Sequence, residues 1–359
     1  MFATGGDYIG KGAYGCIFRP IIPCKSGKYL DSRHKDDAIK VGTTDAGLDR
    51  ETDISKILGK FPEASKYFVL SRDGTCAPPT DIGRHEPEWT RCRHYTAGRD
   101  KITTMIQLPY GGIPWESWRE KHLNVETFDV HTFGQRILEA VALMTLGGVV
   151  HRDLHHGNYL IDSNGLPRII DFGMSFIVKK ESYKLDNLWP FSVSYNQIPP
   201  EMSLWDARWY TRPEKRMPLE TAVMLTATKR YPLQVRRLLW KQSVGKDIEE
   251  LGKYARSSEL FLKGDIDEWW KYNWTKYDAW SCGTLLLNLL YELMRYPTFT
   301  RNNVYNEKKG VIMSVLYKLL HTSPLLRVDA VEALAEWAPD SIILKKYGAA
   351  WLAAKTPAP

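Results

Sequence analysis

The sequence predicts an α+β protein with a small β-rich part followed by a larger, mainly helical part. Extended apolar runs flank a glycine-rich stretch within residues 8–22 and recur at 37–41 and 102–108, which is typical of strands. Residues 128–146 carry apolar side chains at helical spacing instead. A chain of 359 residues is long enough for two domain-sized cores.

Composition indicates a globular protein without a membrane span. Hydrophobic residues make up 43% of the chain and charged residues 25%, and the longest apolar run, around 285–290, is too short to cross a bilayer. Five cysteines are spread at positions 16, 24, 76, 92 and 282, an odd number without a dense framework, which favours a reducing compartment. Residues 1–7 lack the features of a signal peptide. We therefore expect a cytoplasmic protein.

Residues 149–173 predict an active-site hairpin. Two short aliphatic runs flank an Asn-Gly turn signal at 164–165, so we expect the chain to fold back on itself there. The hairpin would bring Asn158, before its first strand, beside Asp171, after its second. An amide oxygen beside a carboxylate can hold Mg²⁺, and a second carboxylate, Asp153, lies five residues upstream as a base. Phosphoryl transfer needs these groups.

The same residues fall into a known pattern. His-Arg-Asp-Leu at 151–154 followed by Asn158, and then Asp-Phe-Gly at 171–173, resembles the catalytic segments of protein kinases. The resemblance implies a bilobal protein-kinase fold that uses ATP and Mg²⁺. It also implies that Asp153 orients the substrate hydroxyl and accepts its proton, and that Asn158 and Asp171 hold the metal ions.

A glycine loop near the start fits this resemblance. Gly10, Gly12 and Gly15 lie between apolar runs, and glycines let backbone N–H groups approach phosphate oxygens closely. Dinucleotide-binding folds use the same spacing, but there a helix follows the loop, whereas here the next run, 17–22, is extended. By resemblance, the nucleotide contacts in this region are Ile9, Gly10, Gly12, Gly15, Ile17 and Ala38.

Lys40 lies among apolar neighbours on the strand predicted at 37–41. It resembles the kinase lysine that contacts the α- and β-phosphates of ATP. Its expected partner is an acid on the helix predicted around 50–58, where positions 54, 57 and 58 are apolar. We predict Glu51 in this role and keep Asp53 as the alternative, because the short connection leaves the helical register open.

The strand predicted at 102–108 leads to Pro-Tyr-Gly-Gly at 109–112. This stretch resembles the hinge where adenine bonds the backbone, so Leu108 and Tyr110 complete the predicted ATP site. The two glycines are expected to loosen the hinge. Together with the preceding residues, this gives a predicted N-lobe of residues 1–110, a C-lobe of residues 111–345 and a tail of residues 346–359 that we expect to fray.

An insertion at 71–100 follows a strand predicted at 67–70. It contains four side chains that can bind zinc: Cys76, His85, Cys92 and His94. Their spacing matches no paired Cys-x-x-Cys pattern, so we interpret them as ordinary loop residues and keep zinc as the lesser alternative.

Two later motifs separate protein kinases from relatives that phosphorylate small molecules. Asp-Ala-Trp-Ser-Cys-Gly at 278–283 opens an apolar helix, and Ser-Pro-Leu-Leu-Arg at 323–327 matches a late Pro-x-x-Arg element. Ile-Pro-Pro-Glu at 198–201 resembles the end of the activation segment, and the hydroxyl-rich stretch before it is a candidate for regulatory phosphorylation. By resemblance, Arg327 forms a partly buried ion pair with Glu201.

A second insertion, about 202–276, reads as helical. One candidate buried face consists of Leu233, Val235, Leu238, Leu239 and Trp240. The insertion holds six of the thirteen tryptophans, and residues 208–246 carry ten Lys or Arg against two Glu. Aromatic anchors beside positive charge suit an acidic peptide, a viral or host partner protein, or nucleic acid. A solvated basic face over a tryptophan-packed scaffold is the alternative interpretation.

The sequence therefore predicts an ATP-dependent kinase that phosphorylates Ser or Thr hydroxyls of protein substrates. Serine/threonine kinases carry lysine at the position of His155, and His155 with Gly157 also resembles the catalytic loop of aminoglycoside-type small-molecule kinases. A small-molecule kinase is therefore one alternative, and a non-catalytic scaffold is another. The run at 16–20 with Pro-Cys at 23–24, and Lys-Tyr-Phe at 66–68 ahead of Cys76, further resembles serine/threonine kinases of large double-stranded DNA viruses. That resemblance implies the host cytoplasm, with packaging in the virion as an open alternative.

Overall fold

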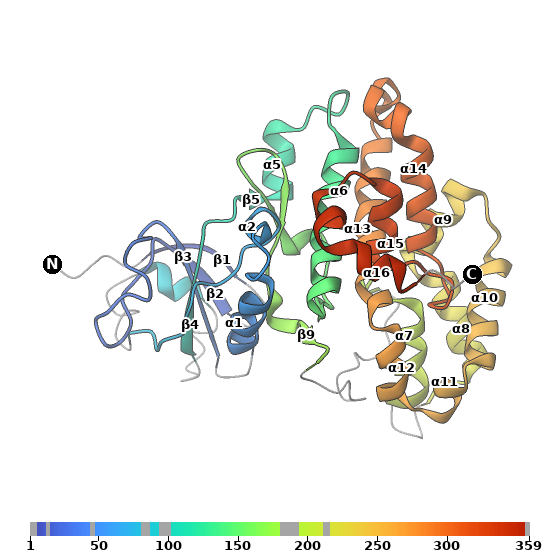
Figure 1. Cartoon of the computed structure of the whole chain (residues 1–359), viewed down its shortest axis with the longest axis horizontal. Helices are drawn as coiled ribbons and strands as arrows, with labels where there is room; N and C mark the ends of the chain where they lie inside the picture. Colours follow the sequence, from blue (N-terminus) through green and yellow to red (C-terminus); the bar gives the residue numbers. More distant parts are fainter. Residues whose placement is uncertain are drawn as a thin grey trace. The chain divides into compact units, whose positions relative to one another are not determined.

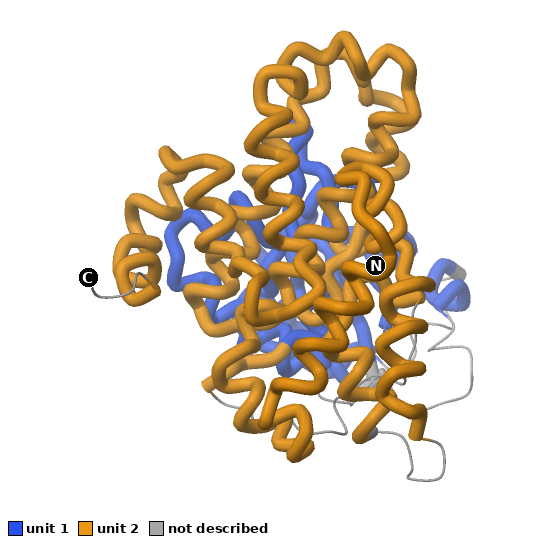
Figure 2. The backbone as a smooth tube through the Cα atoms, turned by 90° about the vertical axis from the view of Figure 1, so that its right-hand side faces the viewer, with its two compact units in different colours: residues 1–115, 159–175 blue, residues 116–158, 176–359 orange. Residues whose placement is uncertain are grey.

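The computed structural model describes residues 6–11, 15–43, 47–79, 87–92, 102–179, 194–210 and 216–355. Its contacts divide the chain into two compact units (Figure 2). Unit 1 consists of Met1–Trp115 and Tyr159–Ser175, and unit 2 of Glu116–Asn158 and Phe176–Pro359. This division differs from the predicted lobe boundary at residue 110, because most of the predicted hairpin groups with unit 1.

A four-stranded antiparallel sheet forms the first part of unit 1 (Figure 1). Its strands, in order, are β1 (Asp7–Lys11), β2 (Gly15–Arg19), β3 (Ala38–Thr43) and β4 (Ile102–Leu108). Phe18, Ile39 and Met105 are buried together in its core. The extended run predicted at 17–22 ends as a strand at Arg19, because Pro20 cannot donate a hydrogen bond to the ladder.

Helix α1 (Gly47–Leu58) confirms the helix predicted near residue 50. It buries apolar residues at helical spacing, including Leu48, Ile54 and Leu58. The short helix α2 (Ala64–Tyr67) follows. The strand predicted at 67–70 is therefore wrong, since its first residue ends this helix and Phe68 forms an isolated bridge with Ile169.

Two disulfides attach the first insertion to β2 and to the segment that follows it. They join Cys16 of β2 to Cys92, and Cys24 to Cys76. The 3-10 helix η1 (Pro87–Arg91) places Trp89 in the same cluster, stacked on Phe18 with ring centroids 4.2 Å apart. The prediction of reduced cysteines is wrong for these four. Because a disulfide sulfur is not a zinc ligand, Cys76 and Cys92 also do not support the zinc alternative. His85 and His94 lie outside the described residues.

The predicted hairpin is confirmed. It consists of β7 (Tyr159–Ile161) and β8 (Pro167–Ile169), which form a sheet with β5 (Ile113–Pro114). In the connection, Asp162 Oδ1 accepts hydrogen bonds from the N–H groups of Asn164, at 2.8 Å, and of Leu166, at 3.0 Å. Such a side-chain turn fixes the chain reversal locally.

Unit 2 is built around long helices. The stripe predicted at 128–146 forms α6 (Val130–Gly147), which Asp129 caps by accepting a 2.8 Å hydrogen bond from the Thr132 N–H. Gly148 ends the helix in the left-handed conformation, with φ of +68°. Against α6 pack α13 (Thr275–Met294), α14 (Asn303–Leu319) and α15 (Ala330–Trp337).

The second insertion is helical, as predicted, and belongs to the core of unit 2. Its elements are α7 (Pro200–Trp205), the π-helix η5 (Asp206–Tyr210), α8 (Leu219–Lys229), α9 (Tyr231–Trp240), α10 (Val244–Ser257), α11 (Glu259–Lys263) and α12 (Ile266–Asn273). Trp205, Trp269 and Trp270 are buried with Val150 and Phe176. This packing favours the scaffold interpretation of the tryptophans.

Several of the described basic residues of this insertion are buried or paired. Arg230 and Arg236 are fully buried, and Arg237 donates to Asp247 at 2.9 Å. Of the predicted buried face, Leu233 and Val235 are in the core. Leu238 is 69% exposed, because α9 turns that position to solvent, so the prediction is wrong there.

The remaining elements are short. They are α5 (Trp115–His122), β6 (Val149–Val150), η2 (His156–Asn158), η3 (Phe172–Met174), β9 (Phe176–Ile177), η7 (Pro297–Arg301), the π-helix η8 (Leu344–Gly348) and α16 (Ala349–Ala353). The tail predicted to fray is helical as far as Ala353, and Trp351 Nε1 donates to Asp329 at 3.0 Å. Within the described ranges, no helix is long and apolar enough to span a membrane.

Candidate active site

Lys40 is held by two carboxylates in unit 1. Its Nζ donates to Oε1 of Glu51, on α1, and to Oδ1 of Asp171 at 2.9 Å. The lysine is 5% exposed. Burial works against its charged form, but the attraction of Glu51 and Asp171 outweighs this and raises the pKa of Lys40. The ammonium is therefore kept charged in a fixed position.

Of the two candidate partners, the structure pairs Lys40 with Glu51. One face of α1 buries Leu48, Glu51, Ile54 and Leu58, so Glu51 points inward with the apolar residues. Asp53, two positions further along, is about half a turn away around the helix. The buried positions of α1 thus decide a register that the sequence had left open.

The glycine loop is described in part. Ile17 and Ala38 lie on β2 and β3 as predicted, and Ile9 on β1 is 50% exposed. At Gly15, an added Cβ would lie 2.0 Å from the carbonyl oxygen of Val41, so close approach of the strands requires glycine. Gly12 lies outside the described residues.

Asp171 follows β8 and has an unusual backbone conformation. Its φ of +64° is in the left-handed region, which is rare for a residue with a side chain. Oδ1 accepts the Lys40 bond and a 3.4 Å bond from the Gly173 N–H, so the carboxylate is oriented by its neighbours in unit 1. Local strain of this kind is concentrated at functional sites.

Asp153 is oriented by a set of hydrogen bonds within unit 2. Asn158 Nδ2 donates to its carbonyl oxygen at 2.7 Å and to Oδ2 at 3.1 Å, while Gln197 Nε2 donates to Oδ1 at 2.9 Å. His155 Nε2 lies 3.5 Å from Oδ2. Burial raises the pKa of Asp153, but the bonds from His155 and Gln197 outweigh it and lower that pKa, which keeps the carboxylate ionised.

The loop that carries Asp153 is fixed by α13. Asp278, near the start of that helix, accepts backbone hydrogen bonds from His151 and from Arg152, the latter at 3.1 Å. Arg152 has a φ of +69°, so these bonds hold a backbone that would otherwise relax. This gives a physical role to the Asp-x-Trp-Ser-x-Gly motif.

The two glycines of the predicted hinge have another role than the looseness expected of them. An added Cβ on Gly111 would lie 2.5 Å from Val69, and one on Gly112 would lie 2.0 Å from the Ile161 carbonyl oxygen. Gly112 also has a φ of +123°. These glycines serve close packing and not looseness. Tyr110, 44% exposed, lies under the Arg19 guanidinium at 4.1 Å.

The predicted pair of Glu201 and Arg327 is confirmed. Two parallel hydrogen bonds of 2.7 and 2.8 Å join the guanidinium to the carboxylate, and both side chains are almost completely buried. Arg327 also donates to the carbonyl oxygens of His321 and Lys276 at 3.0 Å. Its contacts are internal, which fits a structural role.

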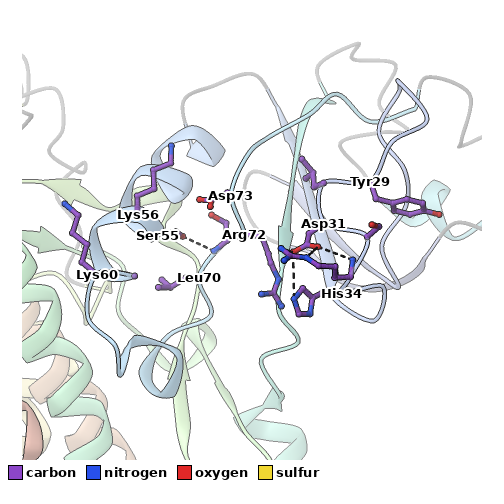
Figure 3. Close-up of a pocket in the computed structure, with 14 residues that line it drawn as sticks. Tyr29, Asp31, His34, Ser55, Lys56, Lys60, Leu70, Arg72 and Asp73 are labelled. Atoms are coloured by element: carbon purple, nitrogen blue, oxygen red, sulfur yellow. Dashed lines mark hydrogen bonds and ion pairs between the residues drawn. The ribbon is translucent and has the colours of Figure 1, made fainter.

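Unit 1 also contains an open polar pocket of about 840 Å³ (Figure 3). It lies between the C-terminal end of α1 and two loops, 29–34 and 70–73. Several of its charges are already matched: Arg33 bonds Asp31 at 2.9 Å, and Arg72 is also in an ion pair. No predicted site residue lines this pocket. Among the described side chains, no cluster of three or more His, Cys, Asp or Glu could hold a metal ion.

Sequence reasoning missed one residue beside the predicted base and another that holds the segment of the first. Gln197 contacts Asp153 directly, and Arg230 bonds the backbone on either side of Gln197. The only signal for Gln197 was its place just before the Ile-Pro-Pro-Glu stretch. Arg230 was hidden among the other basic residues of its insertion.

Comparison with known proteins gives partial matches. A model of the protein kinase domain matches residues 91–214. CBL-interacting protein kinase 24 of Oryza sativa subsp. japonica is 31% identical over 99 residues, which cover 28% of this chain and 21% of that protein. CBL-interacting serine/threonine-protein kinase 24 of Arabidopsis thaliana is 33% identical over 94 residues, 26% of this chain and 21% of that protein. Cyclin-dependent kinase 4 of Xenopus laevis is 26% identical over 173 residues, 47% of each protein. The chain thus spans about half or less of the length of these relatives.

The matched range contains both segments that resemble kinase catalytic motifs, 151–158 and 171–173. Unit 1 supplies a β-sheet with a lysine held by a helix glutamate, and unit 2 is mainly helical. The fold, the motifs and the comparisons agree. Over residues 91–214 the chain is similar to the protein kinase domain.

Proposed function

We propose that this protein transfers the γ-phosphate of ATP to Ser or Thr hydroxyls of other proteins. The observation that carries the proposal is the buried Lys40 ammonium between the carboxylates of Glu51 and Asp171. A lysine fixed in this way keeps its charge and suits contact with phosphate oxygens. The name of the Arabidopsis relative also supports Ser/Thr kinase activity.

Asn158 and Asp171 are proposed to hold Mg²⁺. Mg²⁺ takes oxygen ligands. The amide nitrogen of Asn158 bonds Asp153, while its amide oxygen makes no bond with the described residues and is available to a metal ion. The Asp171 side chain is 29% exposed and thus accessible to a ligand. Bound Mg²⁺ and ATP supply the phosphoryl group and neutralise charge as it is transferred.

Asp153 is proposed to align the substrate hydroxyl and to accept its proton. Its hydrogen bonds to Asn158 and Gln197 fix the direction of the carboxylate before substrate arrives. Preorganisation of this kind lowers the cost of reaching the reactive geometry. Protein substrates, acidic ones among them, are the proposed partners.

The test is transfer of labelled phosphate from ATP to generic basic and acidic proteins. We expect labelling by the wild-type protein and its loss in Lys40→Met and Asp153→Asn. Lys60→Met, which changes an exposed lysine just beyond α1, is the matched control and should keep wild-type labelling. Equal labelling by Lys40→Met and Lys60→Met would refute the proposed role of Lys40.

A small-molecule phosphotransferase is the second candidate, favoured by His155. Nδ1 of this histidine accepts a 3.0 Å bond from the Gly157 N–H, so the ring is fixed in the loop where serine/threonine kinases carry lysine. Transfer to an aminoglycoside without protein labelling would establish this activity instead. Full biological effect of an Asp171→Ala variant would point to a non-catalytic scaffold.

A further inference from the structure

Residues 195–198 of unit 2 are bound by side chains at every backbone carbonyl. Arg230 Nη1 donates to the oxygens of Tyr195, at 2.9 Å, and of Ile198. Trp280 Nε1 donates to Asn196 O at 2.9 Å, and Ser281 Oγ donates to Gln197 O at 2.7 Å. All three donor residues are fully buried, so this segment has a fixed backbone.

The side chain of Gln197 extends from this fixed segment to Asp153. Its Nε2 lies 2.9 Å from Oδ1 of the carboxylate. On the other oxygen, Oδ2 accepts from Asn158 at 3.1 Å and lies 3.5 Å from His155 Nε2. A carboxylate oxygen has two acceptor positions. The bond from Gln197 leaves one position on Oδ1, while on Oδ2 Asn158 takes one position and His155 lies nearby.

We propose that Gln197 is a positioning residue that holds Asp153 so that the remaining acceptor position of Oδ1 faces the incoming hydroxyl. This inference rests on the proposed function, because it assumes that Asp153 is the base. It adds that the orientation of the base is set by the second insertion, through Arg230, and by α13, through Trp280 and Ser281.

All of these contacts are made by side chains that carry no phosphate or other modification. Arg230, Trp280 and Ser281 bind backbone oxygens, and Gln197 binds a carboxylate, so no added phosphate is needed to order this part of the segment. Alignment of Asp153 is therefore expected in the protein as it folds.

The test uses Gln197→Met, which keeps the size and flexibility of the side chain but removes its N–H donors. We expect kcat to fall about tenfold, since a hydrogen bond to a charged group is lost, while KM for ATP and for the protein substrate is unchanged. Gln197→Glu, which places a second carboxylate against Asp153, should reduce kcat at least as much. Gln234→Met is the matched control, because Gln234 donates to carbonyl oxygens of α8 on the surface of the same unit.

A double-mutant cycle separates positioning from general damage. In an Asp153→Asn background, Gln197→Met should cause no further loss of the residual rate, because its effect acts through the carboxylate. Three outcomes would each overturn the inference. They are a wild-type kcat in both Gln197 variants, a changed KM for protein substrate with unchanged kcat, and an additive loss in the double variant. Thermal unfolding of every variant shows whether the fold is kept.

The same series distinguishes the two proposals. An Asp153→Asn variant as active as wild type would remove the base assignment and with it the proposed mechanism. An inactive Asp153→Asn variant beside fully active Gln197 variants would overturn only the role of Gln197.

Discussion

The two disulfides predict that a reductant weakens unit 1 specifically. They close chain loops of 76 and 52 residues, and a cross-link stabilises a fold mainly by restricting the unfolded chain. For these lengths the chain-entropy relation gives about 4.5 and 4.1 kcal/mol at 25 °C, as upper values. Because the shorter loop lies inside the longer one, the two contributions are not additive. We expect each disulfide to contribute about 2–4 kcal/mol.

Hydrogen exchange followed by mass spectrometry measures this effect locally. Peptides from β2 and β3 should exchange faster in the presence of a phosphine reductant, with the free energy of opening reduced by about 2–4 kcal/mol per disulfide. The paired variants Cys16→Ala with Cys92→Ala, and Cys24→Ala with Cys76→Ala, should show the same change without reductant. Peptides from α6 in unit 2 serve as the internal reference.

Thiol labelling provides the control. Protein purified without reductant and then denatured should react at one cysteine, the buried Cys282, and Cys282→Ala should leave the sensitivity to reductant unchanged. Labelling of all five cysteines in that preparation, or identical exchange of β2 with and without reductant, would refute the reasoning.

Three further predictions concern stability. Arg327→Met and Glu201→Gln should each lower the free energy of unfolding by about 3–5 kcal/mol, because each leaves a buried charged or polar partner without its bond. In chemical denaturation, the double variant should lose less than the sum of the two single losses. Additive losses would contradict the pairing. Burial raises the pKa of Asp206 to about 8, against the opposing charge of Arg230, while the unfolded carboxyl titrates near pH 4. Folding then takes up a proton between pH 4 and pH 8, so the free energy of unfolding should fall as the pH rises from about 4 to 8. In urea titrations, this pH dependence should be weaker for Asp206→Asn than for the wild type. The same pH dependence in both proteins would contradict the argument. Gly112→Ala should lower the thermal midpoint, with a cost of about 1–3 kcal/mol, because its Cβ would collide with the Ile161 oxygen at a φ of +123°. At Gly10 an added Cβ meets nothing within 4 Å, so Gly10→Ala is the control, and equal midpoints would contradict the argument.

The parts of the site that follow local rules could be predicted from the sequence. The hairpin has a turn signal between aliphatic runs, so it could be placed. The helical spacing of α1 narrowed the partner of Lys40 to Glu51 or Asp53, and the register of the helix decides between them. The pair of Arg327 and Glu201 was implied by resemblance alone. Its two residues lie 126 positions apart, and no local pattern connects them.

The disulfides could not be predicted for the same reason. Cys92 meets Cys16 because the insertion folds back on β2 and inserts Trp89 against Phe18, which is a tertiary event without a spacing signal. Charge counting failed in the second insertion because it assumes that arginines are exposed. Arg230 and Arg236 are instead buried and bonded to backbone oxygens.

The tryptophan-rich insertion also limits how this protein can change. Its helices pack in the core that contains Phe176 and Val150, which lies directly before the proposed catalytic loop. Leu233 and Val235 of α9 cover Trp280 in the same way. Deleting residues 219–273 would uncover both surfaces, so the segment is no detachable module. Truncation or recombination here would therefore also remove the packing beside the proposed catalytic loop.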